Sequence, residues 1–343
     1  MTQNMIGSQS KSRIGYIDAM RGFTMILVVY HHVILYVLQI DSTINSVFIM
    51  FRMPLFFFIS GFMAYSKEYT QTLFVKRLKN RAYGQLIPTV VVGLLYVAFI
   101  QSDLKSFGFD LFKHGYWFTY CMFQVFVVYA VLTFGLDLLG CTARQKTVAY
   151  LCLIFMAYAF LSLLFVSDVF EHPVFKVLST VFVLKYMLYF LLGVICKTYF
   201  ETFCKFINRN DFSSPLLIIC IVIIALWGYN PITKLLLGIM GIFIVYRIFR
   251  FYQDKFNGNN ALGNVLCYIG RHTLEIYLVH TFFIEGFKQL GGKGLSALCA
   301  ENWCMELVVG FSLAIVITSF CLVVMKVTQT APLLNKLLFG LQK

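Results

Sequence analysis

The sequence predicts an all-α fold, a polytopic bundle of about ten membrane-spanning helices with both termini in the cytoplasm. The 343-residue chain is 60% hydrophobic and only 13% charged, with a mean hydropathy of +0.80, values that soluble domains do not sustain along their whole length. Apolar runs long enough to cross a bilayer core of about 30 Å recur along the chain. Most basic residues fall on alternate connections, as the positive-inside rule requires of a polytopic membrane protein.

Ten apolar runs are expected to form spans. The third, seventh, eighth and ninth are short or interrupted, so ten is a best count. In chain order the expected spans are 22–40, 46–65, 86–101, 116–136, 148–167, 177–196, 215–230, 232–249, 273–288 and 306–325.

The distribution of positive charge sets the expected orientation. With the N-terminus inside, twenty of the 28 Lys and Arg residues lie in inside connections or at inside span ends. The first apolar run follows Lys11 and Arg13 and lacks a small-residue cleavage site, so we expect it to remain as a span. The net charge of +13 is then explained mostly by topology, and nucleic acid is not an expected partner.

The cysteines and the domain organisation exclude several kinds of site. The ten cysteines show no metal-ligand spacing, so no metal site is expected, and only Cys299 and Cys304 are placed to form a disulfide. No soluble domain or long linker is evident. Residues 1–343 are therefore expected to form a single transmembrane domain whose site is made from helix faces and short loops.

Titratable side chains interrupt the first span. Arg21 and His32 are eleven positions apart, which separates them by roughly 16 Å along a helix and only about 20° around it. They should share one face, while His31 is turned away by about 100°. Asp18 lies one turn before Arg21 and could hold its guanidinium by a charge-assisted hydrogen bond.

Two interpretations fit this pattern. Arg21 could extend toward lipid phosphates while the histidines bond neighbouring helices. Alternatively, the site is functional, because ionisable residues inside a span are expensive and a neutral imidazole can accept a proton as a general base. The shared face and the doubled histidine favour the functional interpretation.

The second span reads FRMPLFFFISGFMAY and is expected to be broken. Pro54 removes a backbone donor, and Ser60 followed by Gly61 allows a close backbone approach. Arg52 requires an anion or carbonyl partner, unless it reaches the membrane surface.

The connection that follows this span is strongly basic. Lys76, Arg77, Lys79 and Arg81 fall within six positions of a predicted inside loop. Such a cluster commonly fixes topology or contacts anionic lipid. It also suits a ligand with several phosphates, because guanidinium groups bind phosphate oxygens bidentately.

Further polar residues occur later in the chain. His114 and Trp117 lie at the start of the fourth span, where an interfacial aromatic belt is expected in any case. Lys185 and His280 are ionisable groups within later spans, so they are candidates for the same site.

Four stretches together resemble the membrane acyltransferase-3 family. YIDAMRGFTMILVVYHHV resembles the family's opening motif of Asp, Arg and His, here Asp18, Arg21 and His32. MPLFFFISGF resembles its second-span signature, YWFTY its Trp-Phe motif, and YIGRHTLEIYLVH its late motif, which ends at His280. The order and spacing agree along the whole chain, and the chain resembles the stand-alone form without a C-terminal hydrolase-like domain.

One motif departs from the family pattern. The family usually places two arginines as R-x-x-R after the second span, whereas Arg77 and Arg81 are separated by three residues. On a helix the extra residue rotates the second arginine by about 100°.

The resemblance implies an O-acyltransferase that moves an acyl group, acetyl by default, from cytoplasmic acyl-CoA to a hydroxyl of a cell-envelope glycan or lipid-linked sugar in a bacterial inner membrane. His32 is then the expected general base, with Arg21 and Asp18 in the same catalytic group. Expected contacts to the acyl-CoA donor and to the acceptor come from two further sets: Arg77, Arg81, Lys76 and Ser60 for the donor, and Arg52, Trp117, Lys185 and His280 for the acceptor.

Other functions also fit a chain of this kind. A transporter of an envelope glycan or small molecule would have broken helices and buried charges too, although the two halves show no convincing repeat. A structural subunit of an envelope assembly would leave Arg21 and His32 without a shared purpose. The sequence leaves open the acceptor, the acyl chain, the oligomeric state and a route through an acyl-histidine intermediate.

Overall fold

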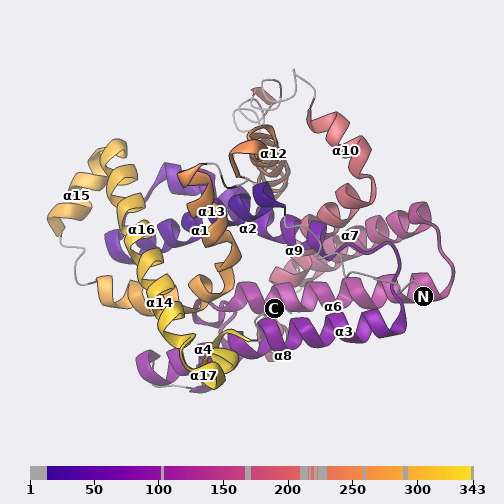
Figure 1. Ribbon diagram of the computed structural model, residues 1–343, viewed down its shortest axis with the longest axis horizontal. Helices are drawn as coiled ribbons and strands as arrows, with labels where there is room; N and C mark the ends of the chain where they lie inside the picture. Colours follow the sequence, from indigo (N-terminus) through magenta and orange to yellow (C-terminus); the bar gives the residue numbers. More distant parts are fainter. Residues whose placement is uncertain are drawn as a thin grey trace, which may run out of the picture.

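The computed structural model describes residues 14–101, 104–166, 171–208, 215, 218–219, 222, 230–256, 258, 260–288 and 293–340. Within these ranges all regular structure is helical, which confirms the predicted all-α membrane bundle (Figure 1). The helices from residue 14 through the fourth expected span are α1 (Gly15–His32), η1 (Val33–Leu38), α2 (Thr43–Ala64), α3 (Gln71–Arg81), η2 (Ala82–Leu86), α4 (Ile87–Tyr96), η3 (Val97–Gln101), α5 (Leu104–Phe109), η4 (Lys113–Gly115) and α6 (Trp117–Leu138).

The second half of the chain continues this arrangement. Its helices are α7 (Ala143–Val166), α8 (Pro173–Val177), α9 (Thr180–Thr198), α10 (Phe200–Ile207), α12 (Pro231–Phe251), η6 (Gln253–Phe256), α13 (Ala261–Arg271), α14 (Thr273–Phe287), α15 (Lys293–Glu301), α16 (Trp303–Thr328) and α17 (Pro332–Phe339).

Eight helical segments of the described chain are long and apolar enough to span a membrane, and they coincide with eight of the ten expected runs. The expected span 215–230 lies largely outside the described residues. The expected span 273–288 corresponds to α14, which has 15 residues and would reach only about 22 Å, less than the bilayer core. Both chain ends also lie outside the described residues.

Two local predictions were wrong. The basic segment after the second span is helix α3 instead of a loop, and it continues through η2 and α4 as one candidate span, Gln71–Ile100. The α3 segment itself contains no Gly or Pro, and Thr70 caps its first turn by accepting a hydrogen bond from the Leu73 amide. The predicted break in the second span is absent, because α2 runs through Pro54 without interruption.

Helix α1 lies at the centre of the bundle, in contact with α2, α12, α13, α14 and α16. It approaches α13 very closely, since a Cβ on Gly22 would lie 2.0 Å from the Leu266 carbonyl oxygen and one on Gly270 would lie 1.7 Å from that of Asp18. Small residues at helix contacts allow such an approach in membrane proteins. Helices α3 and α6 lie side by side (Figure 1).

The cysteine pair that the sequence suggested is not joined. Cys299 in α15 is buried, Cys304 in α16 is exposed, and both are free thiols.

Candidate functional site

Helix α1 presents Arg21 and His32 to the same neighbour, α14, which confirms their predicted shared face. Arg21 donates from Nη2 to the Thr273 hydroxyl at 2.8 Å. His32 Nδ1 lies 2.7 Å from His280 Nε2. Two residues of the opening motif thus contact two residues of the late motif, Thr273 within it and His280 at its end.

The two histidine rings lie nearly parallel to each other. Their planes differ by 14° and their centroids are 4.9 Å apart. His280 is fully buried, and its Nδ1 lies 2.7 Å from the Tyr277 carbonyl oxygen and 3.2 Å from that of Ile276. His32 is only partly buried, so it is the less enclosed member of the pair.

His31 faces a different direction, as predicted. Its Nδ1 lies 3.1 Å from the Asn45 side-chain oxygen on α2. Arg52, also on α2, is 6% exposed, and its Nε and Nη1 atoms have no hydrogen-bond partner among the described residues. Its charge is close enough to act on both His31 and His32, so a cation lies beside the histidine pair.

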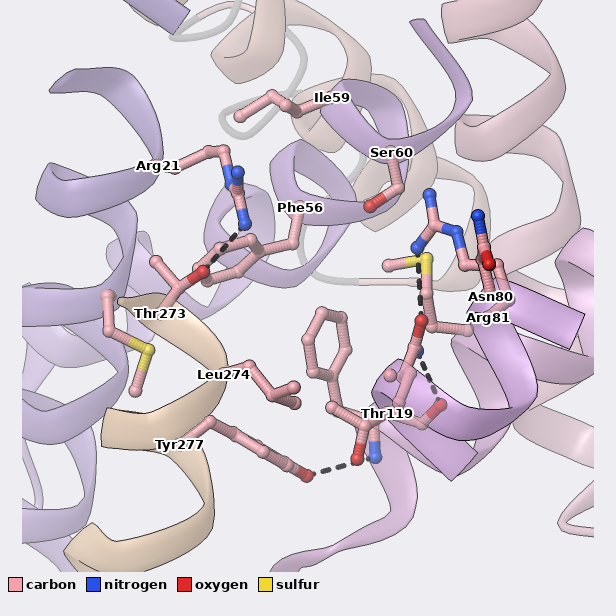
Figure 2. Close-up of a pocket in the computed structure, with 15 residues that line it drawn as sticks. Arg21, Phe56, Ile59, Ser60, Asn80, Arg81, Thr119, Thr273, Leu274 and Tyr277 are labelled. Atoms are coloured by element: carbon pink, nitrogen blue, oxygen red, sulfur yellow. Dashed lines mark hydrogen bonds between the residues drawn. The ribbon is translucent and has the colours of Figure 1, made fainter. Parts of the chain in front are cut away.

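A cavity of about 290 Å³ lies next to Arg21, between α1, α2, the end of α3, η2, α6 and α14. Arg21 and Arg81 project into it from opposite sides, and the Ser60 hydroxyl faces the same space (Figure 2). Phe56, Phe118 and Met25 supply apolar walls. The cavity therefore combines two guanidinium groups with a narrow apolar interior, a combination suited to an anionic ligand that carries an apolar arm.

The cavity stops short of the histidine pair. Its lining reaches Met25 on α1 and Tyr277 on α14. Met25 is seven residues before His32, about 10 Å along the helix, and Tyr277 is one turn before His280. A ligand in the cavity must extend past this boundary to reach His32.

Tyr277 closes that end of the cavity. Its hydroxyl donates to the Gly115 carbonyl oxygen at 2.6 Å and accepts a hydrogen bond from the Phe118 amide at 3.1 Å. Sequence reasoning did not single out Tyr277, although it lies in the late motif three positions before His280. Thr273 and Asn80, which also line the cavity, were missed as well.

The turn that contains Gly115, which accepts the hydrogen bond from Tyr277, is stabilised by a buried lysine. Lys113 is 2% exposed, and its Nζ donates to the carbonyl oxygens of Gly108, Asp110 and Lys176 at 2.7 to 2.8 Å. Burial lowers the pKa of Lys113 to about 8, while the Asp110 carboxylate opposes this shift. Lys113, His114 and Gly115 have consecutive positive φ angles of 49°, 50° and 100°, a strained conformation that the lysine bonds hold in place.

The predicted donor-binding residues separate into different places. Arg81 lines the cavity, donates from Nη1 to the Gln85 side chain at 3.0 Å and lies over the Phe126 ring. Arg77 instead donates to the Ala64 carbonyl oxygen at 2.7 Å and to the Tyr69 hydroxyl at 3.0 Å. Lys76 lines a shallow groove on α3 that shares Asn80 with the cavity.

Asp18 lies between two arginines. Its Oδ1 is 4.0 Å from Arg21 Nη1 and its Oδ2 is 3.6 Å from Arg271 Nε. These are ion-pair distances, and the expected hydrogen bond to Arg21 is not formed. Asp18 therefore offsets the positive charge of both arginines.

The predicted acceptor-binding residues other than His280 gather around Tyr186 on α9. Trp117 stacks on Tyr186, with ring centroids 5.4 Å apart, and the charge of Arg52 acts on the same tyrosine. Lys185 is exposed, with its Nζ 5.5 Å from the Tyr186 ring centroid. The structure thus brings Arg52 and Trp117 to one aromatic wall and leaves Lys185 at the surface.

Both principal site residues end a regular α-helix. The π-helical segment η1 begins directly after His32, and η2 begins directly after Arg81. Such wide turns occur frequently at functional sites.

Comparison with known protein families identifies the family to which the chain belongs. The model of the acyltransferase domain of the acyltransferase-3 family matches residues 14–326, nearly the whole chain. Searches of curated proteins and of solved structures found no significant match. The chain therefore belongs to the acyltransferase-3 family and is an integral-membrane acyltransferase.

Proposed function

We propose that this protein transfers an acyl group, acetyl by preference, from acyl-CoA to a hydroxyl of a cell-envelope glycan or lipid-linked sugar. The observation that carries the proposal is the placement of His32. It lies on the same face of α1 as Arg21, beyond a cavity into which Arg21 and Arg81 project. By the positive-inside rule we expect the Arg21 end of α1 to face the cytoplasm, where acyl-CoA is available. The membrane in this proposal is a bacterial inner membrane.

The shape of the cavity suggests how the donor is held. About 290 Å³ is at the lower limit for a small-molecule site, so we assign to it only the slim thioester arm. The CoA phosphates would lie outside it against Arg81 and the basic surface of α3 that includes Lys76 and Lys79. The family membership supports a thioester donor.

His32 would act as a general base in the transfer. The acceptor hydroxyl gives its proton to His32 while its oxygen attacks the thioester carbonyl. The C–S bond then breaks, the CoA sulfur takes the proton from His32, and an ester and free CoA are released. Arg52, which lies near His32, is the proposed stabiliser of the oxyanion that forms between these steps, while Ser60 lines the donor cavity. Only the acyl group changes sides of the membrane.

The direct test compares the envelope glycans of cells with and without the protein. Loss of an acyl increment on a glycan, together with release of free CoA from labelled acetyl-CoA by isolated membranes, is the expected result. Relocation of unmodified glycan without CoA release would instead indicate a transporter and overturn the proposal.

Direct transfer with His32 as general base and transfer through an acyl-histidine differ in one covalent intermediate. In a single turnover with labelled acetyl-CoA and no acceptor, direct transfer leaves the protein unlabelled, whereas an acyl-histidine route retains the label on the protein.

A further inference from the structure

The surroundings of His280 define which of its nitrogen atoms carries a proton. Its Nδ1 faces the carbonyl oxygens of Tyr277 and Ile276, at 2.7 and 3.2 Å. Carbonyl oxygens accept hydrogen bonds and cannot donate them, so Nδ1 of His280 carries the hydrogen. In a neutral imidazole the other nitrogen, Nε2, then holds a lone pair.

The neutral form is the one that the site favours. His280 is fully buried, and the positive charge of Arg52 already acts on the adjacent His32. A protonated His280 would be a second buried cation near Arg52, and burying it would be costly without an anionic partner.

The short contact between the two rings then determines which nitrogen of His32 carries a hydrogen. His280 Nε2 and His32 Nδ1 are 2.7 Å apart and share one hydrogen. Because His280 Nε2 supplies the lone pair, His32 Nδ1 supplies the hydrogen. We infer that His280 is a positioning residue that holds His32 in the Nδ1–H tautomer and leaves its Nε2 free to accept a proton.

This inference rests on the proposed role of His32 as general base and identifies its Nε2 as the atom that accepts the proton. In the opposite tautomer, Nε2 of His32 would carry a hydrogen and could not take one from the acceptor. In serine proteases an aspartate fixes the tautomer of the catalytic histidine, and loss of that function lowers kcat by about 10⁴-fold. Here a neutral, buried imidazole occupies the corresponding position.

The tautomer can be measured without any activity assay. Protein labelled with ¹⁵N-histidine in lipid bilayers is studied by solid-state NMR, and the His32 signals are assigned by their loss in His32→Gln. We expect the wild-type His32 ring to show a protonated Nδ1 and an unprotonated Nε2. A protonated Nε2 in neutral wild-type His32 would overturn the inference, whether or not the protein transfers acyl groups.

Variants separate positioning from packing. His280→Leu should shift His32 toward the Nε2–H tautomer and lower kcat by roughly 10² to 10⁴-fold, with the KM for acetyl-CoA unchanged. The matched control is Tyr116→Phe, which removes hydrogen bonds to Leu278 and Thr281 on the same stretch of α14. The control should keep the wild-type tautomer, and a change of tautomer in Tyr116→Phe equal to that in His280→Leu would contradict a specific role for His280.

Discussion

His32 Nδ1 and His280 Nε2 lie 2.7 Å apart although 248 positions separate the two residues in the sequence. The contact joins the first membrane helix to α14, and Arg21 joins the same two helices through Thr273. Two polar contacts therefore join α1 to α14, and the cavity lies beside the one between Arg21 and Thr273. Substitutions that alter the cavity, the helix contacts or the histidine pair should have separable effects.

The arginines of α3 should differ in function. Arg81 lines the cavity, whereas Arg77 bonds the last turn of α2. Arg81→Gln should raise the KM for acetyl-CoA about tenfold or more, because a hydrogen bond to a charged group contributes about 1.5–3 kcal/mol. Arg77→Gln should leave that KM unchanged and lower the free energy of unfolding by about 1–2 kcal/mol. Steady-state kinetics and thermal unfolding in detergent measure both, and an equal KM effect of the two variants would argue against this assignment.

The contact between α2 and α9 should not tolerate a methyl group at Gly61. A Cβ there would lie 1.8 Å from the Phe190 carbonyl oxygen, so the helices would have to separate. Gly61→Ala should lower the free energy of unfolding by about 3 kcal/mol. Gly135→Ala is the matched control, because no atom lies within 4 Å of its added Cβ and alanine favours a helix by about 0.5–1 kcal/mol. Equal stability of the two variants would show that the close approach is absent.

The buried acid at the start of α16 should act as a hydrogen-bond acceptor. Glu306 is 6% exposed, and its Oε1 accepts hydrogen bonds from Tyr30, at 2.6 Å, and from Ser42. Glu306→Leu removes the acceptor from both hydroxyl donors and should lower the free energy of unfolding by about 2–4 kcal/mol. Glu306→Gln keeps an acceptor oxygen and should lower it by about 1 kcal/mol or less. Thermal unfolding distinguishes these outcomes, and a Gln variant as unstable as the Leu variant would imply a role for the negative charge.

Helical periodicity predicted the local part of the site. The eleven-residue spacing placed Arg21 and His32 on one face, and both contact α14. The same rule does not separate Arg77 from Arg81, because four residues of helix leave them only about 40° apart around α3. Both were expected to contact the donor, yet only Arg81 lines the cavity, while Arg77 bonds the end of α2.

The tertiary part of the site could not be derived in the same way. The pairing of His32 with His280 depends on how α14 packs on α1, and periodicity within one helix does not define the neighbour. Tyr277 closes the cavity by contacting the turn before α6, a contact that no local pattern encodes. The dense positive charge of residues 71–81 predicts an inside loop, but the segment has no Gly or Pro to interrupt a helix and forms α3.

The most direct measurement of the central claim is acetyl transfer by His32→Ala. Membranes containing equal amounts of wild-type or variant protein are supplied with labelled acetyl-CoA, and the label in extracted glycan is counted. Removal of a general base should lower transfer by roughly 10² to 10⁴-fold, while thermal stability and acetyl-CoA binding remain close to wild type. Near-normal transfer by a folded His32→Ala protein would contradict the account.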